Sequence, residues 1–294
     1  MAFGKKKKEK EMREPFNLKK EVKLLPGYIL LVLWVGFTIM SLVWILVASL
    51  STSPEIMKGE IFKFATGLHP ENYVAAWSAN NISVFFMNSA LYAVTATVCT
   101  VLISAPAAYV LSRFTFLGNK VLKSSFIVAM SIPQIMIVLP LFSLATRFHL
   151  TGTKIVLILL YIGMQVPFTT TFLMSFFSNL SRTYEEAAAI DGCSPMKTFW
   201  QIMLPLAQPG IITVSIFNFM NIWNEYFISL IFGATEKNMS VGPGLKSVLT
   251  SMQYTGNWGG LFAAVIIVFL PTFIIYIFLS EKIIAGVTGG GIKG

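Results

Sequence analysis

The stretch Glu185-Glu186-Ala187-Ala188-Ala189-Ile190-Asp191-Gly192-Cys193-Ser194-Pro195 separates two strongly apolar blocks of the chain. The carboxylates of Glu185 and Glu186 suit the first turn of a helix, where the helix dipole favours negative charge. Gly192 can adopt the left-handed conformation that ends this helix. Ser194 can then cap a second helix, with Pro195 at its first position. The stretch therefore predicts two short helical arms joined by a tight turn.

The second arm carries an apolar stripe on a segment too short to be stable alone in water. The stripe consists of Met196, Phe199, Trp200 and Met203. It either rests on the ends of this chain's own helices or is covered by a partner protein. For the turn and first arm, from 186 to 192, we favour insertion into a partner's groove, because the small side chains of Ala187 and Ala188 permit close backbone approach.

Seven residues in and after this stretch carry a family resemblance. They are Glu186, Ala187, Ala188, Gly192, Ile202, Leu204 and Pro205. This pattern resembles the EAA loop of the membrane-spanning subunits of bacterial ABC importers. The resemblance implies the type I importer permease fold, and it implies that the loop is a cytoplasmic coupling element that docks into a cleft of an ATPase subunit. The coupling residues expected on this basis are Glu185, Glu186, Ala187, Ala188, Asp191, Gly192, Ile202, Leu204 and Pro205.

Composition places the chain among polytopic membrane proteins, since 55% of its 294 residues are hydrophobic, 12% are charged and the mean hydropathy is +0.72. Six stretches reach the roughly 20 apolar residues that cross a bilayer core. We expect an all-α fold with transmembrane helices near 28–50, 87–111, 122–146, 154–177, 210–232 and 260–280. Kinks or breaks are expected at Pro106, Pro133, Pro140, Pro167 and Pro271.

These spans divide the chain into five parts. They are a basic tail at 1–27, the first transmembrane helix at 28–50, an extracytoplasmic segment at 51–86, a five-helix core at 87–281 with the coupling loop at 181–209, and a glycine-rich tail at 282–294. Short amphipathic helices at the membrane interface are expected in the extracytoplasmic segment. Because the apolar stretch after the basic tail is too long for the core of a signal peptide, we interpret it as an uncleaved signal anchor.

The distribution of Lys and Arg predicts the orientation in the membrane. Sixteen of the 22 fall on the side of the N-terminus and the arms, and six fall on the other side. By the positive-inside rule, both termini and the arms are expected to be cytoplasmic. The family resemblance implies that the membrane is the inner or cytoplasmic membrane of a bacterium. The basic tail is expected to lie against anionic lipid headgroups, and we do not expect a nucleic-acid partner.

Residues suited to catalysis are scarce. The two histidines, His69 and His149, fall in different loops, and the two cysteines, Cys99 and Cys193, cannot form a metal cluster. A GxxxxGK[ST] phosphate loop does not occur in the sequence. We therefore expect no catalytic, cofactor-binding or metal-binding residues, and ATP and magnesium would be bound by a partner ATPase.

Polar residues in the fifth span are candidates for lining a solute pathway. Asn218, Asn221 and Glu225 share one helical face, and Asn224 flanks it. Two interpretations stay open: the stripe bonds to a polyhydroxylated solute, or it holds the helix to a neighbour. Two further amides beside prolines in the third and fourth spans, Gln134 and Gln165, are weaker candidates. The run Trp-Asn-Glu-Tyr-Phe at 223–227 also resembles a segment of carbohydrate-type permeases.

The C-terminal end, with glycines at 286, 289, 290, 291 and 294, is expected not to be helical. It resembles the end of the second permease of maltose-type importers, which implies docking against the ATPase. The resemblance covers about 72–294. It implies a sugar or oligosaccharide importer with three kinds of partner: a second and different permease chain, an ABC ATPase dimer and an extracytoplasmic sugar-binding protein. The alternatives are a permease for another solute and an ATP-independent secondary transporter.

Overall fold

The computed structural model describes residues 18–79 and 81–291, and within these ranges all regular secondary structure is helical. The chain divides into a unit that ends at Val47 and a unit that begins at Ala48. The first consists of most of α1 (Leu18–Ser49). This helix contains an apolar segment of 28 residues, Val22–Ser49, which is long enough to cross a membrane. The helix α1 begins at Leu18, ten residues before the span predicted at 28–50.

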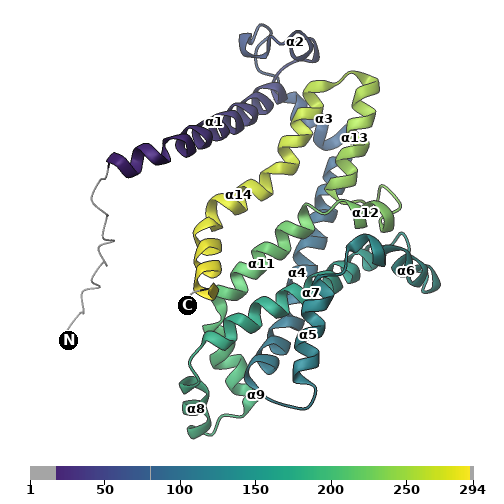
Figure 1. Cartoon of the computed structure of the whole chain (residues 1–294). Coiled ribbons are helices and arrows are strands. Elements are labelled where there is room, and N and C mark those ends of the chain that lie inside the picture. Colours follow the sequence, from purple (N-terminus) through teal and green to yellow (C-terminus); the bar gives the residue numbers. More distant parts are fainter. Residues whose placement is uncertain (1–17, 80, 292–294) are drawn as a thin grey trace, which may run out of the picture. The chain divides into compact units, whose positions relative to one another are not determined.

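The second unit contains the remaining helices (Figure 1). They are α2 (Ser53–Lys58), η1 (Ile61–Lys63), α3 (Glu71–Ala79), α4 (Ile82–Arg113), α5 (Asn119–Met130), α6 (Gln134–Arg147), α7 (Lys154–Asn179), α8 (Thr183–Ile190), α9 (Pro195–Thr198), the π-helix η2 (Phe199–Met203), α10 (Leu204–Leu206), α11 (Gln208–Trp223), α12 (Phe227–Phe232), α13 (Val241–Thr255) and α14 (Trp258–Gly291). The short helices α2, η1 and α3 lie where the extracytoplasmic segment was predicted.

Four of the described helices are long and apolar enough to span a membrane by themselves. Their spanning segments are Val22–Ser49, Ile82–Arg113, Lys154–Asn179 and Trp258–Glu281. Two further pairs qualify as broken spans: α5 with α6, bent by 100°, and Pro195–Leu206 with α11, bent by 72°. The all-α polytopic prediction is therefore confirmed, with four continuous spans and up to six when each bent pair counts as one.

The third span, predicted at 122–146 with a kink or break at Pro133, is broken there. α5 ends at Met130 and α6 begins at Gln134, with Pro133 in extended conformation at the start of α6. Proline lacks an N–H donor and disfavours helical conformation in the residue before it, Ile132. The expectation of a kink or break at Pro133 is confirmed, whereas Pro106, Pro140, Pro167 and Pro271 lie within α4, α6, α7 and α14.

The fifth span, predicted as continuous at 210–232, is also interrupted. α11 ends at Trp223 and a new helix, α12, begins at Phe227. The Glu225 carboxylate accepts the N–H groups of Ile228 and Ser229, which would otherwise have no partner at the start of a helix. A side chain in the break thus stabilises the new helix.

The expectation that the glycine-rich end is not helical is wrong up to residue 291, because α14 continues to Gly291. Each glycine costs about 1 kcal/mol relative to alanine in a helix. Extending a long helix that already exists nevertheless avoids the unfavourable nucleation step. Residues 292–294 of the tail, and 1–17 of the predicted basic tail, lie outside the described residues.

Two aromatic clusters lie along α4, α7 and α11, which pack against one another (Figure 1). The first contains Tyr92, Tyr161 and Trp223, all at most 2% exposed. The second joins α4 and α7 to the arms and contains Tyr109, Phe177, Phe199 and Met203. The core of the second unit therefore extends into the second predicted arm.

Candidate functional site

The two arms have the caps that the sequence predicts. Gly192 has φ +75° and is the second residue after the end of α8, and its N–H donates to the carbonyl of Ala189. The Ser194 hydroxyl accepts the N–H of Lys197 at 3.3 Å, and Pro195 is the first residue of α9. The turn is therefore fixed by local hydrogen bonds, and a residue with a Cβ at 192 would be strained.

The apolar stripe of the second arm is only partly covered by this chain's own helices, which were one of the two predicted ways to cover it; the other was a partner protein. Phe199 and Met203 are 3% and 0% exposed and pack in the cluster of Tyr109 and Phe177. Met196 and Trp200 are 68% and 47% exposed. This chain's own helices therefore cover one half of the stripe and leave the other half open.

The residues expected to couple to an ATPase differ in their exposure to solvent. Glu186, Ala187, Asp191, Gly192 and Pro205 are exposed, whereas Ala188 is buried, and Glu185, Ile202 and Leu204 are half-buried. Ile190 was not among them, yet its side chain is 86% exposed. The sequence did contain a signal for Ile190. A large apolar side chain on a short helix between two apolar blocks is expected to be buried against another part of the chain or against a partner protein.

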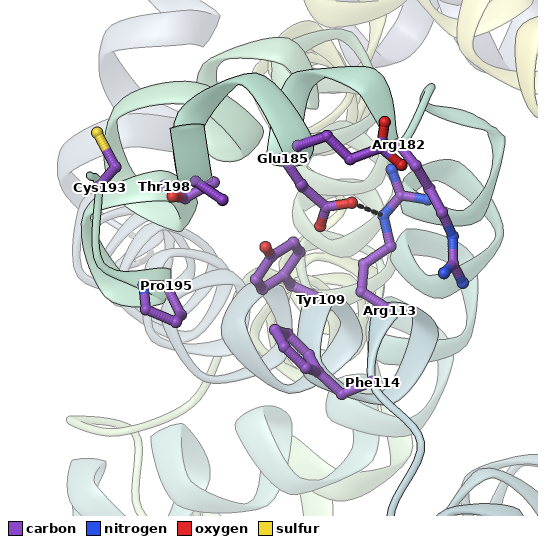
Figure 2. A pocket seen from close by; sticks show the side chains of 10 residues that line it. Tyr109, Arg113, Phe114, Arg182, Glu185, Cys193, Pro195 and Thr198 are labelled. Carbon is purple, nitrogen blue, oxygen red and sulfur yellow. Dashed lines mark ion pairs between the residues drawn. The ribbon is translucent and has the colours of Figure 1, made fainter. Parts of the chain in front are cut away.

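A cavity of about 320 Å³, the arm pocket, lies between the first arm and the end of α4 (Figure 2). Arg113 Nε is 3.2 Å from Glu185 Oε2, and Arg113 Nη2 donates to the carbonyl of Leu180 at 2.8 Å. The Arg113 side chain is only 5% exposed. The lining residues are Tyr109, Arg113, Phe114, Arg182, Glu185, Glu186, Ala189, Cys193, Pro195 and Thr198. Arg113 thereby ties the first arm to α4.

A second cavity, the amide pocket, has a volume of about 470 Å³. It is lined by Gln134, Tyr161, Met164, Gln165, Asn221, Ile222, Glu225, Tyr226 and Phe227. It contains four of the six residues predicted to line a pathway, contributed by α6, α7, α11 and the break after α11. Amides can donate and accept hydrogen bonds, so the pocket suits a polar, uncharged solute.

Glu225 is the best-connected side chain of the amide pocket. Its Oε1 accepts the N–H of Ile228 at 2.6 Å, and its Oε2 accepts the N–H of Ser229 at 3.0 Å and the Tyr161 hydroxyl at 2.9 Å. Sequence reasoning missed Tyr161, which lies 64 residues from Glu225 and belongs to an ordinary apolar span.

The structure does not place Asn218 or Asn224 in the amide pocket. Asn218 is fully buried and exchanges hydrogen bonds with the Thr169 hydroxyl at 2.9 and 3.2 Å, so it joins α11 to α7. Asn224 donates to the carbonyl of Met220 at 2.8 Å, one turn earlier in its own helix. For Asn218 the geometry supports the interpretation as contact between helices.

Residues 100–281 match the family of binding-protein-dependent transport system inner membrane components, and the chain belongs to this family. It is 33% identical over 264 residues to the diacetylchitobiose uptake system permease protein NgcG of Streptomyces coelicolor, a match that covers 90% of this chain and 87% of that protein. It is 30% identical over 286 residues to the trehalose/maltose transport system permease protein MalG of Thermococcus litoralis, covering 96% and 100%.

The fold is similar to that of a chain from a bacterial ABC transporter involved in the import of the acidic polysaccharide alginate. The TM-score is 0.79 at 19% identity, over 92% of this chain and 99% of that one, which establishes a shared fold. Taken with the family, the chain is a membrane-spanning permease subunit of an ABC importer and not an enzyme, because ATP hydrolysis in this family belongs to a separate ATPase. No group of three metal-ligating side chains occurs within 18–79 and 81–291.

Proposed function

We propose that this permease imports a sugar or oligosaccharide, and that its two arms couple the membrane helices to a separate ATPase. The relatives named above are permeases for diacetylchitobiose and for trehalose or maltose, which supports a saccharide substrate. In this proposal both termini and the arms are cytoplasmic. The partners are a second permease of different sequence, an ATPase dimer that holds ATP and magnesium, an extracytoplasmic sugar-binding protein and the lipid bilayer.

The observation that carries the coupling proposal is the arm surface, formed by Glu186, Ala187, Ile190, Met196 and Trp200. All five are exposed, and Ile190, the last residue of α8, is 86% exposed. Exposed apolar side chains grouped on a rigid support are typical of a protein interface. A groove in the ATPase would cover these side chains, while Phe199 and Met203 transmit its movement to the core of this chain.

The arms would act as a lever between two states of the importer. ATP binding closes the ATPase pair, and the arm surface must dock differently in the closed and open states for this energy to reach the membrane helices. Arg113 holds the first arm on the end of α4, and Phe199 holds the second arm on Tyr109 and Phe177. Through these contacts movement of the arms reaches α4 and α7, and the amide pocket lies on the pathway that they open.

The test uses Gly192→Pro and Glu186→Lys in the importer reconstituted with its ATPase, second permease and binding protein. Proline cannot adopt φ +75°, and the lysine reverses a charge on the arm surface. Both variants should insert normally, abolish ATP-dependent uptake and leave ATP hydrolysis insensitive to the loaded binding protein. Glu60→Lys, which reverses a half-exposed charge far along the chain from the arms, is the control. Normal uptake by both arm variants would contradict the coupling proposal.

A further inference from the structure

The described lining of the amide pocket contains an acidic residue and no basic one. None of the nine described residues that line it is Lys, Arg or His, and Glu225 is its single carboxyl group. The other polar groups of its lining are the amides of Gln134, Gln165 and Asn221 and the phenols of Tyr161 and Tyr226. A solute in this cavity therefore meets neutral hydrogen-bonding groups and one carboxylate.

The carboxylate of Glu225 is held in place by three donors. Two are backbone N–H groups of α12 and the third is the Tyr161 hydroxyl. Each donor is directed at a carboxylate oxygen, and an ionised carboxylate accepts about four hydrogen bonds through its two oxygens. One acceptor position thus stays open for a hydroxyl of a solute, whereas a second anion would meet the negative charge without a cation nearby.

We infer that the amide pocket is a selectivity site that admits neutral saccharides and disfavours anionic ones, with Glu225 as the residue that makes the distinction. The inference rests on the proposed saccharide pathway and adds a substrate class to it. A neutral sugar can exchange hydrogen bonds with the three amides and donate to Glu225. A uronate or a sulfonated sugar would place like charges close together in a cavity partly shielded from water, where repulsion is stronger than in bulk solvent.

The charge of the pocket can be measured without knowing the sugar. The background carries Cys99→Ala and Cys193→Ser, which remove both native thiols, and Asn221→Cys places one thiol in the pocket wall. The assembled importer is treated with two small methanethiosulfonates of similar size, one a trimethylammonium cation and the other a sulfonate anion. The quantity measured is the ratio of their rate constants, cation over anion, relative to the same ratio for a small free thiol.

The expected ratio is at least about tenfold in favour of the cation. Adding Glu225→Gln should bring the ratio close to that of the free thiol. Glu225→Gln changes the hydrogen bonds of this side chain as well as its charge. Tyr161→Phe is the control for the hydrogen bonding, because it removes one hydrogen bond to the carboxylate and leaves the charge, so the ratio should stay high. Equal rates for the two reagents, or a ratio unchanged by Glu225→Gln, would overturn the selectivity inference.

Failure of the wider proposal gives a different result. If neither reagent reacts with the introduced thiol, with or without ATP, the pocket is not on a water-filled pathway, and the inference falls together with the pathway assignment. If both reagents react at equal rates, only the charge selection falls, and the importer remains a saccharide permease with an unselective pocket.

Discussion

The two ends of α4 hold their neighbouring segments with similar polar contacts but leave very different surfaces. Near its start, Asn88 donates to the carbonyls of Lys237 and Met239 at 2.8 and 3.0 Å, and Tyr92 donates to that of Asn238 at 2.8 Å. At its last residue, Arg113 holds the chain at 180–185. The side chains of Asn88 and Tyr92 are buried and the segment that they bind continues into the buried Ser240 and Val241, whereas beside Arg113 the arm surface stays exposed.

On the coupling proposal, this difference separates contacts that complete the fold from contacts that hold the arm surface in place for the ATPase. Buried polar groups that are fully bonded stabilise one arrangement of a core. An exposed apolar residue such as Ile190 contributes little to the stability of the isolated chain, because it remains in water. Substitutions near the start of α4 should therefore lower stability, whereas substitutions on the arm surface beside its end should lower transport.

The largest effect is expected for Ile190→Asp. The side chain is 86% exposed, so folding should be unchanged, but a charge in the centre of the proposed ATPase contact should cost about 2 kcal/mol or more of docking. Uptake in the reconstituted importer should fall at least about tenfold, and less ATPase should co-purify. Met57→Asp, at a 76% exposed residue of α2, should behave like the wild type. Unchanged uptake and co-purification for Ile190→Asp would show that the exposed arm surface does not bind the ATPase, and the two ends of α4 would then not differ in function.

A smaller effect, on the arm alone, is expected for Arg113→Gln. The change leaves Glu185 and the Leu180 carbonyl without their charged partner, at a cost of about 3 kcal/mol for a largely buried pair. Hydrogen exchange at 181–192 should accelerate by about a hundredfold, while 237–241 stays protected. Arg147→Gln, at an exposed arginine in the last turn of α6, is the matched control. Equal protection of the arm in both variants would show that Arg113 does not hold it.

The start of α4 should respond in stability. Asn88→Ala removes two hydrogen bonds of a buried amide and leaves two carbonyls without this donor, which should cost about 2 kcal/mol. The thermal midpoint in detergent should fall by about 5 °C, and the surviving folded protein should still bind the ATPase. Ser78→Ala, which removes an exposed bond to the carbonyl of Val74, should change stability by less than about 0.5 kcal/mol. A similar loss in both variants would mean that burial at Asn88 contributes nothing.

What could be predicted from the sequence was local. The turn at Gly192 and the cap at Ser194 depend on neighbouring residues, and both were predicted correctly. The contacts Arg113–Glu185 and Tyr161–Glu225 join residues far apart in the chain, so no spacing rule reveals them. Asn218 shows the same limit: its helical face was predicted, but the choice between solute and neighbouring helix depended on Thr169, 49 residues away. The break before α12 was missed because Glu225, which lies in it, was assigned to the same helical face as Asn218 and Asn221, and because apolar residues resume at Phe227.

The smallest and most local effect is expected at Glu55, outside the spans. Its carboxylate, 6% exposed, accepts the N–H and hydroxyl groups of Thr52 and Thr66 at 2.8–3.0 Å. The Thr52 N–H contributes most to lowering the pKa of Glu55 from 4.5 to about 2. Because the folded pKa is the lower one, this stabilisation is complete above about pH 4.5 and is lost as the pH falls through about 2.

The difference in thermal midpoint between wild type and Glu55→Gln should therefore be constant from about pH 8 to about pH 5 and become smaller at more acidic pH. Glu60→Gln removes an exposed carboxylate of the same segment, which pairs with Lys63 at 2.7 Å, and should change the midpoint little at any pH. If the Glu55→Gln difference grew on acidification instead, the carboxylate would be protonated in the folded chain. The segment at 51–72 would then not be held by an ionised Glu55, and the contrast between this fully bonded segment and the exposed arm surface would be weaker.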